Sequence, residues 1–515
     1  MVESEFPRSP AATLSALVGG GLIAATFLDF ALWPLAWFAF VPILVALERP
    51  MRARRAIWLG LVAGMATNVP AFFWLVHTIH VFGGFPLWVS LFFYIALSIA
   101  SSLQFVIFAL ALRRAGFGPA AIHPVLLWVT LEFFFPNLFP WRLANSQRDV
   151  PLLLQIGDVT GPFGLSFVMI WASAAMALVL RRGIRQARSA LVLCAAAILC
   201  VVGYGVVRLP AIDELVGGAP KVKLGLVQGN LTIEEKSDVR YFEGNLDTYR
   251  KVSEALSPTP DVVIWPETVI TEPLPRSLEE LTPNGRAILG LRWPLFTGSL
   301  TYDADARGER FFNSVILFDA NGRVLGFSDK QILMPFGEFM PFGSIFPVLK
   351  SISPQTGDFQ AGTAVKPLDV PGVARFAPLN CYEDLRATIA RRAVHDGRAQ
   401  ILFAVANDGW FGDSSEQWQH MANSVFRTVE NGLPLVRCSN NGVTCLIDGR
   451  GRIENIFRDK SGSEYGTGTL TVEIPLLQPG QKSSATFYNR HGDWFGWGCV
   501  GMTMLVLLPR LRRKD

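Results

Sequence analysis

The stretch ARFAPLNCYEDL, residues 374–385, is an apolar run that ends in a cysteine beside two carboxylates. The apolar part is typical of a buried strand, and Cys381 comes directly after it. A cysteine in this position can be a packing residue, half of a disulfide, a metal ligand or a nucleophile. The rest of the chain has to decide among these four roles.

Two other stretches place charged side chains at the ends of apolar runs. Glu267 follows the strand-like run in VVIWPET, and Lys330 and Glu338 surround the apolar turn in FSDKQILMPFGEFMPF. Taken singly, Glu267 is equally well explained as a solvated loop carboxylate, whereas Lys330 is better explained as surface charge and Cys381 as inert core sulfur. In α/β sheets, however, side chains at strand ends converge on one crevice. The three stretches together therefore indicate a single site.

The region around these stretches has the pattern of an α/β domain. Segments 239–256, 385–396 and 416–431 look helical and alternate with strand-like runs rich in Val, Ile, Leu and Phe. Such alternation predicts buried sheets covered by helices. The strand-like runs are KVKLGLVQGN, DVVIWPET, WPLFTGSL, FFNSVILFD, ARFAPLNCYED, ILFAVANDG, LPLVRCSNNG, VTCLIDGRG and GTLTVEIPL.

The dipeptide Asn441-Gly442 lies between two of these runs and predicts a hairpin with a type I′ turn. In that register Cys438 would face Cys445, where a disulfide is conceivable in an oxidising compartment. Six cysteines in 515 residues are too few for a disulfide scaffold, and those in apolar runs are explained as packing residues. The sequence has no CxxC, no HExxH and no Cys/His cluster at metal spacing, so no metal or cofactor is expected.

The chain as a whole is unusually apolar, with 50% hydrophobic and 17% charged residues and a mean hydropathy of +0.34. Residues 1–210 are mostly long apolar runs, whereas residues 211–490 have the composition of a soluble domain. A membrane-spanning helix needs about 20 mostly apolar residues. Eight candidate spans meet this pattern, near residues 12–28, 32–47, 56–78, 86–112, 119–136, 162–180, 189–207 and 493–509.

The basic residues predict the orientation of these spans. Arginines and lysines cluster at 49–55, 113–114, 181–188 and 510–514, and all four clusters fall on one side if the N-terminus lies there. By the positive-inside rule both termini are then cytoplasmic, and segment 208–492 lies outside. In a bacterium this places the chain in the inner membrane with its soluble domain in the periplasm. The small net charge of +4 gives no indication of a nucleic acid partner.

The order Glu267, Lys330, Cys381 resembles the active site of the nitrilase superfamily, which has a Glu, a Lys and a Cys in that order. With the predicted spans, nearly the whole chain resembles the apolipoprotein N-acyltransferase family. Further matching stretches are VQGN (227–230), NDGWFGDS (407–414), QWQH (417–420) and SNNGVT (439–444). The resemblance implies a transmembrane α-helical bundle of about eight spans plus an extracytoplasmic α/β nitrilase-like domain with an α-β-β-α sandwich. The expected domains are a bundle at 1–210, a catalytic domain at 220–478, and a last span with a basic tail at 490–515.

The resemblance also implies roles for individual residues. Glu267 is the general base, Lys330 the cation that stabilises the oxyanion and Cys381 the nucleophile. The supporting or substrate-binding positions are Glu338, Tyr382, Glu383 and Trp410, whereas His420 is expected to be structural. One departure is visible, because LTIEEKSDVRYF after VQGN lacks the tryptophan that the family can carry there.

The reaction implied by the family is a ping-pong acyl transfer. Cys381 takes an acyl chain from a phospholipid as a thioester and passes it to the α-amine of an N-terminal diacylglyceryl-cysteine of an apolipoprotein. The apolar loop 333–347 is expected to cover the site and to enter the membrane lipid. A membrane-tethered amidase with water as acceptor is an alternative that uses the same residues. A transporter or sensor with an inactive binding domain is a second alternative, which a missing triad residue would favour.

Overall fold

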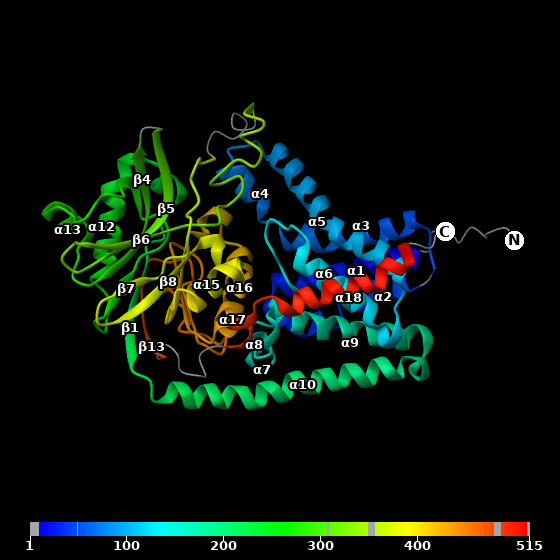
Figure 1. Ribbon diagram of the computed structural model, residues 1–515. Coiled ribbons are helices and arrows are strands. Elements are labelled where there is room, and N and C mark those ends of the chain that lie inside the picture. Colours follow the sequence, from blue (N-terminus) through cyan, green and yellow to red (C-terminus); the bar gives the residue numbers. More distant parts are fainter. Residues whose placement is uncertain (1–9, 49, 306–307, 349–355, 478–485, 512–515) are drawn as a thin grey trace. The chain divides into compact units, whose positions relative to one another are not determined.

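The computed structural model describes residues 10–48, 50–305, 308–348, 356–477 and 486–511. It forms two compact units (Figure 1). The first comprises the chain up to Ile79, Pro86–Arg208 and the segment from Asp493 onward, and the second comprises His80–Phe85 and Leu209–Gly492. Residues 512–514, predicted to form a basic cytoplasmic tail, lie outside the described residues.

The first unit is helical, as its apolar runs predict. Helices α5 and α9 end at glycines with positive φ, Gly116 (+63°) and Gly183 (+81°), a conformation that residues with a Cβ rarely adopt. The elements are α1 (Pro10–Leu28), η1 (Phe30–Trp37), α2 (Phe40–Leu47), α3 (Ala53–Ala71), α4 (Leu75–His77), η2 (Thr78–Phe82), α5 (Leu87–Ala115), η3 (Pro119–Ala121), α6 (Ile122–Phe134), η4 (Leu143–Gln147), α7 (Pro151–Leu154), α8 (Gly157–Thr160), α9 (Pro162–Arg182), α10 (Ile184–Gly217) and α18 (Trp494–Leu511). Of these, η2 continues into the second unit at His80 and α10 at Leu209.

All eight predicted spans lie in helical segments, but they differ in length. Among the described residues, five helical segments are long and apolar enough to cross a membrane: Pro10–Leu28, Phe30–Leu47, Leu87–Ala115, Pro162–Arg182 and Ile184–Gly217. The predicted span 56–78 is a pair of helices bent by 70°, which makes a sixth if it is counted as one. The predicted spans 119–136 and 493–509 are shorter apolar helices, Pro119–Phe134 and Trp494–Leu508.

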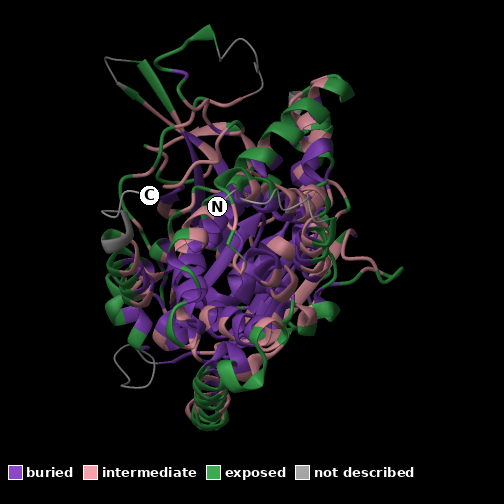
Figure 2. Ribbon diagram, turned by 90° about the vertical axis from the view of Figure 1, so that its right-hand side faces the viewer, coloured by how far each residue is buried: buried purple, intermediate pink, exposed green. Residues whose placement is uncertain are grey.

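The long helices expose apolar side chains, as membrane-facing helices do. Only 22% of the most apolar window of α10 is buried, and its Leu199 and Val207 are 71% and 74% exposed. Such faces are unfavourable in water, at about 25 cal/mol per Å² of apolar surface. Polar side chains are placed inside instead, where Glu132 accepts hydrogen bonds from the Trp128 indole and the Leu143 amide. Figure 2 shows which parts of the chain are buried and which are exposed.

The second unit contains two sheets, with strand orders β13-β1-β2-β4-β5-β6 and β12-β11-β10-β9-β8-β7, and β3 pairs with β4. The central strands β1, β2 and β4 of the first sheet are parallel, as are β8, β9 and β10 of the second. The strands are β1 (Lys221–Gln228), β2 (Val262–Ile264), β3 (Ile270–Pro275), β4 (Leu295–Asp305), β5 (Gly308–Phe318), β6 (Val324–Asp329), β7 (Leu368–Val370), β8 (Ala374–Asn380), β9 (Ile401–Ala406), β10 (Leu435–Ser439), β11 (Cys445–Ile447), β12 (Ile453–Glu454) and β13 (Gly468–Pro475).

Apolar side chains from both sheets form one core between them. Phe296 on β4 packs against Phe376 on β8 and Phe403 on β9, with ring centroids 5.1 and 4.7 Å apart. Helices α12 and α13 cover the other face of the first sheet, and α15 and α16 pack on the second. The helices of this unit are α11 (Ile233–Ser237), η5 (Val239–Tyr241), α12 (Phe242–Ser253), α13 (Pro283–Leu289), η6 (Cys381–Leu385), α15 (Ala387–His395), η7 (Asp408–Phe411), α16 (Glu416–Asn431) and α17 (Phe487–His491).

The nine predicted strand runs are confirmed, and the hairpin between β10 and β11 is present. Its predicted turn and register are wrong. The connection runs over residues 440–444, closed by the Thr444 hydroxyl, which accepts from the Ser439 amide at 3.1 Å. Arg437, not Cys438, therefore pairs with Cys445. Because of this one-residue difference in register, Cys438 and Cys445 point to opposite faces of the sheet. Both cysteines are free thiols.

Candidate active site

Three strands of the second unit lead into the three residues that the sequence singled out. Glu267 follows β2, Lys330 directly follows β6, and Cys381 directly follows β8. The Glu267 and Lys330 side chains are 7% and 2% exposed, so neither is the surface group that it could have been on its own. Cys381 is half-buried.

Lys330 lies between two carboxylates. Its Nζ is 3.1 Å from Glu267 Oε1 and 2.9 Å from Glu338 Oε2. Burial lowers the pKa of Lys330, but the charges of Glu267 and Glu338 outweigh burial and raise the pKa well above its usual value. Lys330 is therefore a permanent ammonium group, held in place by two anions.

Asn313 on β5 connects these groups and was not singled out from the sequence. Its Nδ2 donates to Glu267 Oε1 at 2.9 Å and to Glu338 Oε1 at 2.7 Å, and its Oδ1 accepts from Asn380 Nδ2 at 2.9 Å. Its backbone carbonyl also accepts from the Lys330 amide at 2.8 Å. One buried amide thus orients both carboxylates and the residue before Cys381. The signal in the sequence was a polar residue inside the apolar run FFNSVILF.

Cys381 begins the short helical segment η6, here called the cysteine turn (Cys381–Leu385). Its φ is +49°, a left-handed conformation that non-glycine residues rarely adopt and that recurs at functional sites. Burial and the Glu267 charge raise the pKa of the thiol well above its usual value, although the Lys330 charge opposes them. The thiol is therefore protonated at neutral pH, and a nucleophilic role requires a base.

The two residues after Cys381 hold the cysteine turn in place. Glu383 accepts from the amides of Gln331 at 2.6 Å and Asn380 at 2.9 Å, so it ties the turn to the segment after Lys330. Burial raises the pKa of Glu383 to about 7. The Tyr382 hydroxyl accepts from Arg386 Nη2 at 2.9 Å.

Lys236 on α11 is a second buried lysine that the sequence gave no means to find. Its Nζ donates to the Glu267 carbonyl at 2.8 Å. Burial lowers the pKa of Lys236 to about 8, despite the opposing charges of Glu267 and Cys381. It lies in the LTIEEKSDVRYF stretch that lacks the family tryptophan. Trp410, on η7, packs its ring 4.1 Å from the ring of Phe82.

The apolar loop 333–347 carries several exposed side chains, which sets it apart from a core loop. Phe342 is 69% exposed, Ile345 66% and Phe346 57%. Exposed apolar side chains in a group indicate contact with lipid or another apolar surface. That the loop covers the site and enters the membrane stays a prediction.

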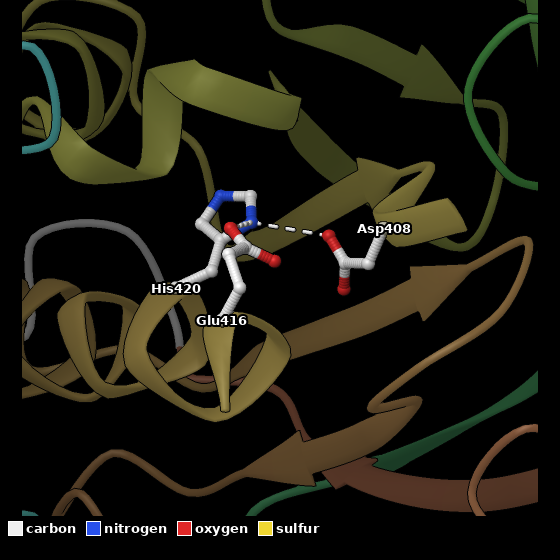
Figure 3. Close-up of side chains that lie close together, drawn as sticks. All are labelled: Asp408, Glu416 and His420. Atoms are coloured by element: carbon white, nitrogen blue, oxygen red, sulfur yellow. Dashed lines mark hydrogen bonds and ion pairs between the residues drawn. The ribbon is translucent and has the colours of Figure 1, made fainter. Parts of the chain in front are cut away.

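Asp408, Glu416 and His420 form the one group of potential metal ligands among the described residues, with ligand atoms within 4.8 Å of one another (Figure 3). A cation already occupies this position. Arg437 Nη2 lies 2.9 and 3.0 Å from the two Asp408 oxygens and 2.9 Å from His420 Nδ1. The residues therefore do not fit a metal ion.

Comparison with known proteins identifies the family of the chain. Residues 19–175 match the family described as apolipoprotein N-acyltransferase N-terminal domain, and residues 223–478 match carbon-nitrogen hydrolase. Two curated relatives are named apolipoprotein N-acyltransferase. The protein from Geobacter metallireducens is 33% identical over 98% of this chain and 96% of its own length, and that from Allorhizobium ampelinum is 32% identical over 81% of each.

A solved structure resembles part of the chain. Nit3 of Saccharomyces cerevisiae, described as a member of branch 10 of the nitrilase superfamily, aligns with a TM-score of 0.37 at 15% identity. The alignment covers 53% of this chain and 95% of Nit3.

Proposed function

Because this chain belongs to the apolipoprotein N-acyltransferase family, we propose that it acylates lipoproteins through a thioester on Cys381. The observation that carries the proposal is the Glu267–Lys330–Glu338 cluster, joined through Asn313 to the residue before a half-buried cysteine. A base, a fixed cation and a thiol beside one another are the groups that acyl transfer requires.

The first half-reaction takes an acyl chain from a phospholipid. The thiol of Cys381 gives its proton to Glu267 while its sulfur attacks the ester carbonyl. The Lys330 ammonium stabilises the negative charge that develops on the carbonyl oxygen. The carbon–oxygen bond then breaks, and the leaving oxygen takes the proton from Glu267 to give a lysophospholipid.

The second half-reaction passes the chain to the lipoprotein. The α-amine of the diacylglyceryl-cysteine attacks the thioester carbonyl and gives a proton to Glu267. The carbon–sulfur bond breaks, an amide forms, and the sulfur takes the proton back as a thiol. Glu267 and Cys381 thus return to their starting states, and no cofactor enters the balance.

The raised pKa of Cys381 supports a base-dependent mechanism. A resting thiolate would react with any electrophile, whereas a protonated thiol attacks only when Glu267 accepts its proton. Lys330 is a permanent cation and cannot act as that base, so its role is electrostatic.

The membrane helices support lipid substrates on both sides of the reaction. We place the second unit in the periplasm of a bacterial inner membrane, with both termini cytoplasmic, on the distribution of arginines and lysines. We also propose that Glu338, Tyr382, Glu383 and Trp410 support the site or bind the two lipids.

The test is to supply phospholipid and a synthetic diacylated lipopeptide to the purified protein and to follow the lipopeptide by mass spectrometry. Addition of one acyl chain to the lipopeptide is the expected result, with none in Cys381→Ala. Release of free fatty acid alone would favour the membrane-tethered amidase or hydrolase. Cys438→Ala is the matched control, since Cys438 is a buried thiol on β10 outside the Glu267–Lys330 cluster.

A further inference from the structure

Five ionisable side chains are buried behind the cysteine turn, and the proposed reaction uses none of them. Asp384, Asp408, Glu416, His420 and Arg437 are each at most 6% exposed, and they are called the charge cluster here. Arg437 Nη1 donates to Asp384 Oδ2 at 2.7 Å, and Arg437 Nη2 donates to both Asp408 oxygens. His420 contributes a second bridge, with Nε2 2.8 Å from Asp384 and Nδ1 3.1 Å from Asp408.

Opposite charges in the charge cluster stabilise one another. Burial raises the pKa of Asp384 and Asp408, but Arg437 and His420 outweigh it, so both carboxyls have lowered pKa values and are anions. Burial and Arg437 lower the pKa of His420, but the two aspartates raise it to about 10. Burial raises the pKa of Glu416 well above its usual value, which keeps it neutral. Two buried carboxylates therefore face the guanidinium of Arg437 and the imidazole of His420.

The charge cluster joins two turns that lie far apart in the sequence. Asp384 belongs to the cysteine turn, and its Oδ2 also accepts from the Ser424 hydroxyl on α16 at 2.6 Å. Asp408 begins η7, the turn that carries Trp410. One guanidinium on β10 and one imidazole on α16 bind both turns at once. The charge of Asp408 also raises the pKa of the Cys381 thiol.

The cysteine turn needs such support. Cys381 keeps its left-handed φ of +49° only if the surrounding contacts hold it there, because a residue with a Cβ prefers other conformations. Reciprocal capping contacts between Asn380 and Glu383 hold the beginning of the cysteine turn, and Asp384 holds its end through the charge cluster.

We propose that Arg437 and His420 are positioning residues that clamp the cysteine turn to the Asp408–Phe411 turn and so hold the Cys381 sulfur ready to attack. The inference rests on the function proposed above, in which Cys381 is the nucleophile. The clamp does not touch the substrate. It acts by holding the Cys381 sulfur in a fixed position relative to Glu267 and Lys330 before the lipid binds.

The test compares single-turnover acylation of Cys381 by phospholipid in wild type, Arg437→Lys and Asp384→Asn. Arg437→Lys keeps the charge but cannot donate to both aspartates with a planar group. Each variant is expected to acylate about 10- to 100-fold more slowly at saturating donor, because small misplacements of reacting groups have effects of this size. The donor concentration at half-saturation is expected to change much less than the rate at saturating donor, since the clamp itself makes no contact with lipid.

Ser424→Ala keeps the test valid if the charge variants do not fold. It removes one hydrogen bond to Asp384 and leaves every charge in place, and a several-fold slower acylation is expected. Asp369→Asn is the matched control, since it breaks an Asp–Arg pair at 3.8 Å whose carboxylate is 65% exposed. The control is expected to acylate at the wild-type rate.

The outcomes separate this inference from the proposed function. If wild type forms no acyl-Cys381, the proposed function fails. If wild type does so and the charge variants have lower thermal stability but wild-type acylation per folded molecule, the clamp is merely structural and the inference is overturned. A stoichiometric metal in the purified protein that is lost in Glu416→Gln would also overturn it, because the cluster would then hold an ion.

Discussion

Replacement of Asn313 by leucine tests how far one buried amide organises the site. Leucine has nearly the same size but can neither donate to Glu267 and Glu338 nor accept from Asn380, so all three hydrogen bonds are lost at once. Lys330 remains paired with both carboxylates. The variant therefore keeps the charges of the site and loses their orientation.

The size of the effect follows from these contacts. A hydrogen bond to a charged group contributes about 1.5–3 kcal/mol. If only the bond that aims Glu267 at the thiol matters for the rate, acylation slows by about 10- to 150-fold, at about 1.4 kcal/mol per tenfold. The bonds to Glu338 and Asn380 then affect mainly stability, and Tm falls by several degrees.

The assay is single-turnover acylation from phospholipid, measured by intact-protein mass spectrometry beside a thermal melt. Asn321→Leu, at an exposed turn position after β5, is the control for adding an apolar side chain. Acylation within about twofold of wild type in Asn313→Leu would refute the reasoning, since a difference that small is below the contribution of a single charged hydrogen bond.

Three further predictions concern proton binding. The folded state of the wild type holds the Glu383 proton up to about pH 7, whereas the unfolded state loses it near pH 4.5, so the wild type loses up to about 3 kcal/mol of stability between these pH values. In Glu383→Gln this loss is expected to disappear, as thermal melts across the range would show. Between about pH 8 and 10.5 only the unfolded wild-type chain keeps the Lys236 proton, so the stability of the wild type rises with pH in that range. In Lys236→Met this rise is expected to disappear, and melts with the same pH dependence as the wild type would contradict the prediction. In Glu267→Gln, the base that accepts the Cys381 proton is removed while burial still keeps the thiol protonated, so acylation by phospholipid falls by at least about 100-fold, as intact-protein mass spectrometry would show; acylation at the wild-type rate would contradict this role.

Much of the fold was readable from the sequence because it depends on local pattern. The nine strand runs and the helical segments at 385–396 and 416–431 follow hydrophobic periodicity, which the structure keeps. The missed strands β3, β6, β7 and β12 are short or mixed in polarity and exist through pairing with neighbours. The hairpin register depended on the Thr444–Ser439 contact, which no propensity of Asn441-Gly442 encodes.

The candidate site was predictable only in part, for the same reason. Glu267, Lys330 and Cys381 sit at strand ends, where topology brings side chains together, and their order along the chain resembles a known family. Asn313, Lys236 and Arg437 act through contacts between residues far apart in the sequence. Asn313 and Arg437 are polar residues inside apolar strands, and this is the signal that the sequence contains for them. Their hydrogen-bond partners could not be named without the fold.

The most direct measurement is the mass of the protein after brief exposure to a phospholipid of defined chains, followed by peptide mapping. One acyl chain should appear on the peptide that contains residue 381, and it should leave when a diacylated lipopeptide is added. An enzyme that modifies the lipopeptide at full rate while residue 381 stays unmodified, or that does so with alanine at that position, would contradict the account.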